Sequence, residues 1–175
     1  MTLQELLPGV GAASNLHPVF VHLPLGLWPV ALAFLGWGAL RADARIFEVG
    51  RWLLYLAALA AAVTAASGWI AADGLGHDSP GHDAVHEHRN WMLVALGLTT
   101  MTAALAFFLR STNRAAHRWV VVAALAVTLG VAALGADRGA YLVYGKGVGT
   151  QLQHLSSTEE VPGHGPTSGG HGHEH

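Results

Sequence analysis

The sequence predicts an all-α integral membrane protein, built as a bundle of four transmembrane helices. Hydrophobic residues make up 52% of the 175 residues and charged residues only 11%, whereas soluble domains carry about 25% charged residues. Four stretches lack Asp, Glu, Lys and Arg, and each approaches the roughly 20 residues that a helix needs to cross a bilayer. These predicted spans are residues 19–40, 52–72, 91–109 and 119–136.

The first span follows Pro18, which suits the first turn of a helix because the N–H that proline lacks would be unpaired there. Pro24 and Pro29 lie inside the span and should kink it, leaving carbonyls that need other partners. Residues 1–18 contain no Lys or Arg. We therefore expect no signal peptide, and we expect the first span to remain in the protein.

The other three spans have simple signatures. Alanines repeat at every fourth position of the second span, a pattern that lets helices approach closely in lipid. Ser79 and Pro80 form a good N-cap and first-turn pair, so the helix of the third span should begin well before the membrane. The fourth span is the shortest. We expect one membrane domain over residues 1–149 and a flexible tail rich in His and Gly over residues 150–175.

Arginines predict the orientation. The two loops after spans one and three hold six of the nine Lys and Arg residues, and the positive-inside rule places both loops in the cytoplasm. The six are Arg41, Arg45, Arg51, Arg110, Arg114 and Arg118. Both termini and the middle loop then face the periplasm or the cell exterior, and we expect a multi-pass protein of the cell inner membrane. The lipid bilayer is its first partner, whereas a net charge of −2 predicts no nucleic-acid surface.

Histidine is concentrated on the outer side in this topology. Of twelve histidines, only His117 lies at the cytoplasmic end. His22 is the strongest single candidate, because ionisable residues within a span usually face the bundle interior and serve a function. Alternatively, it is an interfacial residue bonded to a neighbouring carbonyl. For His17, which precedes a proline at the helix start, a capping or interfacial role is favoured over ligation.

The middle loop offers two competing arrangements. His82 and His86 share a helix face, the usual spacing for two imidazoles on one metal, and could join Asp83 and a residue of the first span around a divalent metal. Alternatively, His88, which lies about 200° round the helix from His86, faces His22 across the bundle. Solvated loop histidines are the competing interpretation.

The C-terminal segment VPGHGPTSGGHGHEH cannot build a core. His-rich tracts of this kind bind Zn, Ni or Cu weakly, and a cloning remnant is the alternative. The tail therefore says little about function.

The run HPVFVHLPLGL (residues 17–27) resembles the opening signature of the bacterial membrane family known as domain of unknown function 2231. HEHRNWML (residues 86–93) and the glycine-rich YLVYGKGVG (residues 141–149) fit the same order. The resemblance covers the chain up to about Gly149. It implies four helices laid out as in b-type cytochromes and a redox setting, and it leaves the choice between His86 and His88 open. The positions it singles out are His17, Pro18, His22, Pro24, Gly26 and His88.

Three functions follow from these patterns. The first is electron transfer by haem b bound near the outer face between the first and third helices, since haem iron takes axial imidazoles from facing helices. Its predicted ligands are His22 with His88 or His86, and His17 is a further candidate. A redox partner or a larger membrane complex would accompany this role.

The second function is divalent metal binding on the outer face, with Zn, Cu or Ni as the metal, because imidazole with carboxylate suits these ions. Its predicted ligands are His22, His82, His86, His88 and Asp83. The third is a non-catalytic accessory subunit. The absence of cysteine excludes disulfides, thiolate metal sites and c-type haem attachment, and no hydrolytic constellation is found.

Overall fold

The computed structural model describes residue 6 and residues 15–73, 81–112 and 114–148. The predicted Ser79–Pro80 cap and the tail lie outside these residues. In chain order the helices are α3 (His17–Leu40), α4 (Ala44–Asp73), α5 (His82–Phe108) and α6 (Ala115–Lys146), with a 3-10 turn, η1 (Leu109–Ser111), after α5. The predicted all-α class is confirmed, and all four helices are long and apolar enough to cross a membrane.

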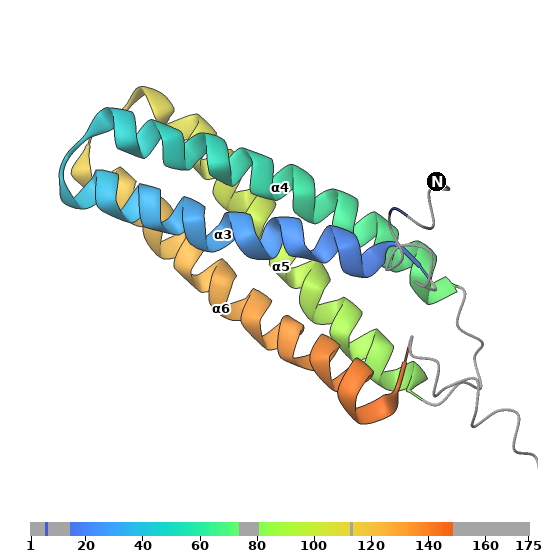
Figure 1. Cartoon of the computed structure of the whole chain (residues 1–175). Helices are drawn as coiled ribbons and strands as arrows, with labels where there is room; N and C mark the ends of the chain where they lie inside the picture. The colour runs from blue at the N-terminus through green and yellow to red at the C-terminus, as the bar shows by residue number, and fades with distance from the viewer. Residues whose placement is uncertain (1–5, 7–14, 74–80, 113, 149–175) are drawn as a thin grey trace, which may run out of the picture.

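The helices form two hairpins that lie side by side (Figure 1). α3 packs on α4 and α5 packs on α6, while α4 contacts α5 and α3 contacts α6. α3 and α5 therefore lie on one diagonal of the bundle. The connection 41–43 and the turn η1 lie at the same end (Figure 1), which we call the arginine end. We call the opposite end, where α3 and α5 begin, the histidine end.

The two hairpins repeat one another along the sequence. The buried positions of α3 (Pro24, Trp28, Ala31 and Leu35) recur 71 residues later in α5 as Ala95, Thr99, Thr102 and Ala106. In the second helices, Phe47, Gly50, Leu54, Ala57, Ala61 and Thr64 of α4 correspond in the same way to buried residues of α6. If α3 is matched with α5 and α4 with α6, the contact between α4 and α5 corresponds to the contact between α6 and α3, and both contacts are present. The bundle thus has the pattern expected for an approximate twofold axis along its length.

The first hairpin packs backbone against backbone through two glycines. A Cβ on Gly38 would lie 2.5 Å from the backbone N of Phe47, and a Cβ on Gly50 would lie 2.7 Å from the backbone N of Leu35. Neither position therefore has room for a side chain. Such close approach is typical of helix association in lipid, where apolar burial supplies little driving force.

Pro24 lies inside α3 without ending it. Because proline has no N–H, the carbonyl of Phe20 loses its usual partner four residues later. The hydroxyl of Thr64 on α4 donates to this carbonyl at 3.0 Å and is shared with the carbonyl of Ala60 at 2.8 Å. Thr64 therefore satisfies the acceptor that Pro24 exposes and ties α3 to α4 near the histidine end.

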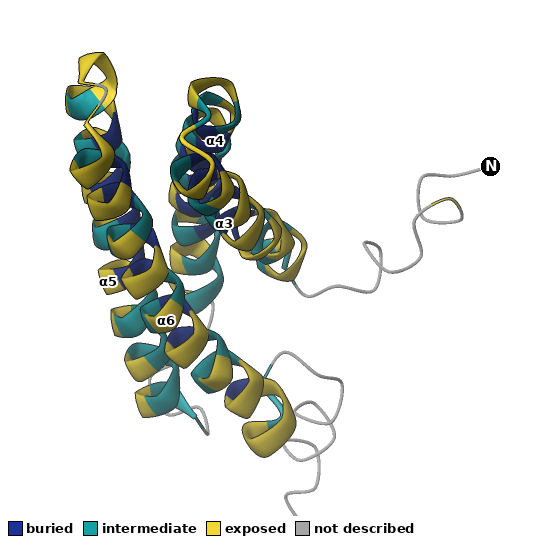
Figure 2. Ribbon diagram, turned by 90° about the vertical axis from the view of Figure 1, so that its left-hand side faces the viewer, coloured by how far each residue is buried: buried dark blue, intermediate teal, exposed yellow. Residues whose placement is uncertain are grey.

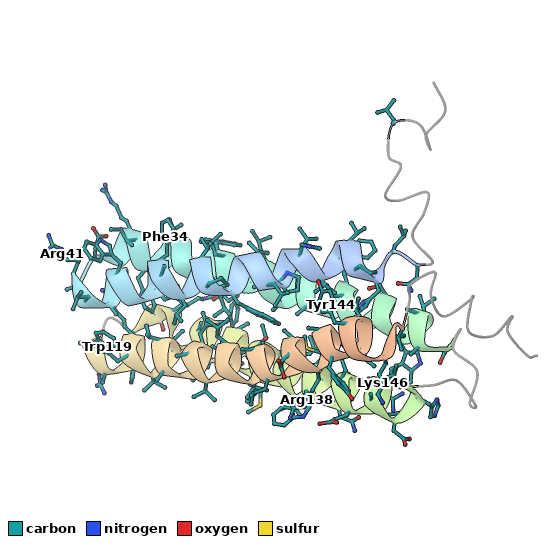
Figure 3. The ribbon with its side chains drawn as sticks, turned by 60° about the horizontal axis from the view of Figure 1, so that its bottom comes forward. Phe34, Arg41, Trp119, Arg138, Tyr144 and Lys146 are labelled. Atoms are coloured by element: carbon teal, nitrogen blue, oxygen red, sulfur yellow. The ribbon has the colours of Figure 1, made fainter. Side chains whose placement is uncertain are left out.

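Exposed residues cover the outward faces of all four helices (Figure 2). Many are large and apolar, among them Ile70, Met101 and Phe108, whose exposed fractions are 70% or more. Phe34 points outward from α3, and Arg41 and Trp119 lie at one end of the bundle while Arg138 and Lys146 lie toward the other (Figure 3). An apolar outer surface between polar ends is what a helical bundle in lipid requires.

Candidate functional site

His17 is the first residue of α3 and is half-buried. Its Nδ1 lies 3.1 Å from the hydroxyl oxygen of Ser67 on α4. That hydroxyl donates its own proton to the carbonyl of Thr64 at 2.8 Å, so it accepts from Nδ1–H of the imidazole. The neutral tautomer of His17 is thereby fixed, and its Nε2 carries the free lone pair.

His88 lies in the second turn of α5, and its Nδ1 is also engaged in a hydrogen bond to the next helix. Its Nδ1 lies 2.8 Å from the backbone carbonyl of Gly135 on α6. A carbonyl only accepts, so Nδ1 is the donor and Nε2 again carries the lone pair. Nδ1–H bonded to a carbonyl or hydroxyl is the usual orientation of histidines that ligate a metal through Nε2.

Each of these imidazoles rests on a glycine of the next helix in its own hairpin. A Cβ on Gly68 would lie 2.8 Å from Cε1 of His17, and a Cβ on Gly139 would lie 2.9 Å from Cε1 of His88. Both pairs are separated by the same number of residues. Glycine at these positions therefore leaves each imidazole the space it occupies.

His17 and His88 are equivalent positions of the two hairpins, 71 residues apart. Their helices lie on one diagonal of the bundle, and each imidazole is hydrogen-bonded to the second helix of its own hairpin. The carbonyl of Thr64, which accepts from Ser67 beside His17, is the counterpart of the Gly135 carbonyl, which accepts from His88. The structure thus presents a matched pair of half-buried imidazoles, one from each half of the bundle.

His22 is placed differently. Its side chain is exposed, and its Nδ1 lies 2.7 Å from the carbonyl of Pro18 in its own helix. This corresponds to the alternative interpretation of His22 as an interfacial residue. The first-helix histidine at the position equivalent to His88 is His17, for which the sequence analysis favoured a capping or interfacial role.

His82 and His86 meet on one face of α5, as their spacing predicts. Their Nε2 atoms are 2.9 Å apart, and Nη2 of Arg89 lies 2.6 Å from Nδ1 of His86. Because the guanidinium can only donate, Nδ1 of His86 accepts and its Nε2–H points at His82. Arg89 also lies over the ring of Trp69 on α4, 5.0 Å from its centroid, which fixes this chain of contacts to the bundle.

A complete metal centre is not assembled in the described parts of the chain. Among these residues, no three His, Asp or Glu side chains come together in an arrangement that could hold a metal ion. Asp83 is exposed. The predicted set of His22, His82, His86, His88 and Asp83 is therefore divided into the His82–His86 pair, His88 beside α6, and two exposed residues.

Sequence reasoning missed the residues that hold the imidazoles. Ser67 and Gly68 lie at the end of an alanine-rich span, where small residues are expected for packing alone. Gly135 and Gly139 are four residues apart on one face of α6, a spacing that could have indicated a close contact. Gly139, however, lies against the imidazole of His88, and Gly135 lies against the side chain of Met92 while its carbonyl accepts from His88.

The profile of a family described as Predicted membrane protein (DUF2231) matches residues 13–152. The chain belongs to this family. The match spans all four helices of this DUF2231 protein and confirms the resemblance carried by residues 17–27, which form the start of α3. Comparison with curated proteins and with solved structures gives no match.

Proposed function

We propose that this DUF2231 protein binds one haem b between α3 and α5 near the histidine end and carries electrons. His17 and His88 are the axial ligands in this proposal. The observation that supports it is the pair of equivalent imidazoles on diagonal helices, each with Nδ1–H engaged in a hydrogen bond, so that Nε2 is the nitrogen that carries the lone pair. Haem sites in helical bundles are built from inward-facing side chains of opposite helices in this way.

The residues present fit such a group. Two neutral imidazoles are a common axial donor set for haem iron. Ser67 and the Gly135 carbonyl orient the rings and increase the basicity of Nε2, and Gly68 and Gly139 add no side chain beside them. When bound, haem supplies a one-electron couple. The repeated hairpins provide ligands of the same kind on both sides of the approximate twofold axis.

The proposal extends to orientation. We propose that the arginine end faces the cytoplasm, as the positive-inside rule predicts, and that the histidine end and both termini face the outside of the inner membrane. Electrons would then be exchanged near the outer face with a redox partner or within a larger membrane complex.

The test is the absorption spectrum of the full chain, purified in detergent from haem-replete cells. We expect a Soret band that shifts on reduction with dithionite, and close to one haem per chain by the pyridine haemochrome assay. The control is a second four-helix membrane protein purified from the same cells, which measures how much haem binds non-specifically. A colourless protein would contradict the proposal and favour an accessory role.

A divalent metal at His82 and His86 is the second candidate function, because their Nε2 atoms, 2.9 Å apart, could rotate onto a single ion such as Zn²⁺, Cu²⁺ or Ni²⁺. We expect the double variant His82→Ala, His86→Ala to bind Zn²⁺ more weakly than wild type in calorimetric titrations, by a factor of roughly ten or more. His117→Ala, at the other end of the bundle, is the control, and the tail contributes equally to every titration. Equal affinity in all three proteins would contradict this site.

A further inference from the structure

A cavity of about 210 Å³ lies at the arginine end, between the start of α4, the turn η1 and the start of α6. Its inner wall is apolar and includes Phe47, Ala106 and Val121. Most of the other lining residues are polar or charged. The cavity is therefore suited to a ligand that carries both a charged and an apolar part.

The charges on the wall are mainly positive. Three elements each contribute one guanidinium group, namely Arg51 from α4, Arg110 from η1 and Arg118 from α6. Glu48 is the one carboxylate among the lining residues, and it is ion-paired with Arg51. Three cations facing one anion leave a net positive electrostatic potential at the cavity.

Two of these guanidinium groups are held inside the bundle. Arg118 is only 9% exposed, and it lies over the ring of Phe47 with Nη1 directed at the Gly38 carbonyl, 3.4 Å away. Nε of Arg51 is buried and has no hydrogen-bond partner among the described residues. Buried N–H groups without an acceptor are uncommon in proteins, so this N–H calls for an acceptor oxygen.

The position of the cavity along the bundle bears on which ligand could supply oxygen atoms to these arginines. Trp52 and Trp119 directly follow two of the lining arginines, and both residues are exposed. Exposed tryptophans of this kind mark the headgroup level of a bilayer. The cavity therefore lies where lipid phosphates lie, and arginine is the side chain best matched to phosphate oxygens.

We propose that this cavity is a binding site for the phosphate group of an anionic phospholipid in the leaflet at the arginine end. Arg51, Arg110 and Arg118 contact the phosphate oxygens, and the acyl chains continue along the apolar outer surface. Basic pockets between transmembrane helices bind anionic headgroups by this chemistry. The site is about one membrane thickness from the imidazole pair and does not depend on the proposed haem.

Native mass spectrometry of the full chain tests the proposal, by titration with phosphatidylglycerol and with phosphatidylcholine of the same acyl chains. We expect wild type to retain one molecule of phosphatidylglycerol and to bind it more tightly than phosphatidylcholine. Arg51→Gln and Arg110→Gln should each lower that affinity by roughly tenfold, the loss expected for one charge-assisted hydrogen bond. Arg45→Gln is the matched control, because Arg45 is exposed on α4 and does not line the cavity.

The outcomes of this titration distinguish a lipid site from a soluble phosphate site and from no site at all. Arg110 is exposed, so its variant should fold even if Arg51→Gln does not, and circular dichroism verifies this. Equal lipid retention by Arg110→Gln, Arg45→Gln and wild type would overturn the site. Displacement of phosphatidylglycerol by millimolar inorganic phosphate would overturn the lipid assignment in favour of a soluble phosphate. No displacement, with selective loss in the two cavity variants, would support it.

Discussion

Gly38→Ala is expected to destabilise the bundle by about 1–3 kcal/mol, the usual cost of inserting atoms into a packed contact. The new Cβ would lie 2.5 Å from N and 2.7 Å from Cα of Phe47. Both are backbone atoms of α4, so no side chain can move aside, and the two helices must separate. Thermal unfolding in detergent, followed by circular dichroism, measures the effect as a lower midpoint.

Gly36→Ala is the matched control, two residues away on the same helix. A Cβ at this position has nothing within 4 Å, so the substitution removes only the conformational freedom of glycine. Because alanine favours a helix by up to about 1 kcal/mol over glycine, we expect an unchanged or slightly higher midpoint. Equal midpoints for the two variants would show that α3 and α4 do not approach as closely as the structure has them.

The fold could be predicted because lipid imposes strict requirements on length and composition. Each apolar run had to be a helix, since a bilayer core cannot satisfy an open backbone. The ends were harder to predict. α5 and α6 extend beyond their apolar runs, where Glu87 on α5 and Arg138 on α6 form an ion pair at 2.8 Å. A criterion that ends a span at its first charge cannot detect this pairing between helices.

The internal repeat was not visible in the sequence because the two halves share few identical residues. Leu25-Gly26-Leu27 and Leu96-Gly97-Leu98 are one short match at the common offset. What the halves share is the set of buried positions, and burial is a property of the fold. Once the buried residues are known, the repeat and the equivalence of His17 and His88 follow.

The preference for His22 over His17 was formed without knowledge of the rotational phase of the first helix. The buried residues Pro24, Trp28, Ala31 and Leu35 form a stripe with steps of four, three and four residues. His17 lies seven residues before Pro24 and falls on this stripe, whereas His22 lies well off it. Depth in the membrane was the criterion used, but facing the interior depends on phase.

The same phase argument determines the expected behaviour of the histidine variants. If haem is bound as proposed, His17→Ala and His88→Ala each lose the Soret band, because one axial ligand disappears and an alanine cannot replace it. His22→Ala should keep the full spectrum, since its imidazole is exposed and bonded within its own helix. The measurement is haem content per folded chain, with the helical signal as the check on folding.

A second substitution separates ligation from simple support of the fold. Methionine at an axial position keeps haem bound and raises its reduction potential relative to two histidines. We therefore expect His88→Met to retain haem and to titrate at a higher potential than wild type.

Loss of haem in His22→Ala, with retention in His17→Ala, would mean that α3 is rotated from the phase described here. The pair first indicated by depth in the membrane, His22 and His88, would then hold the cofactor.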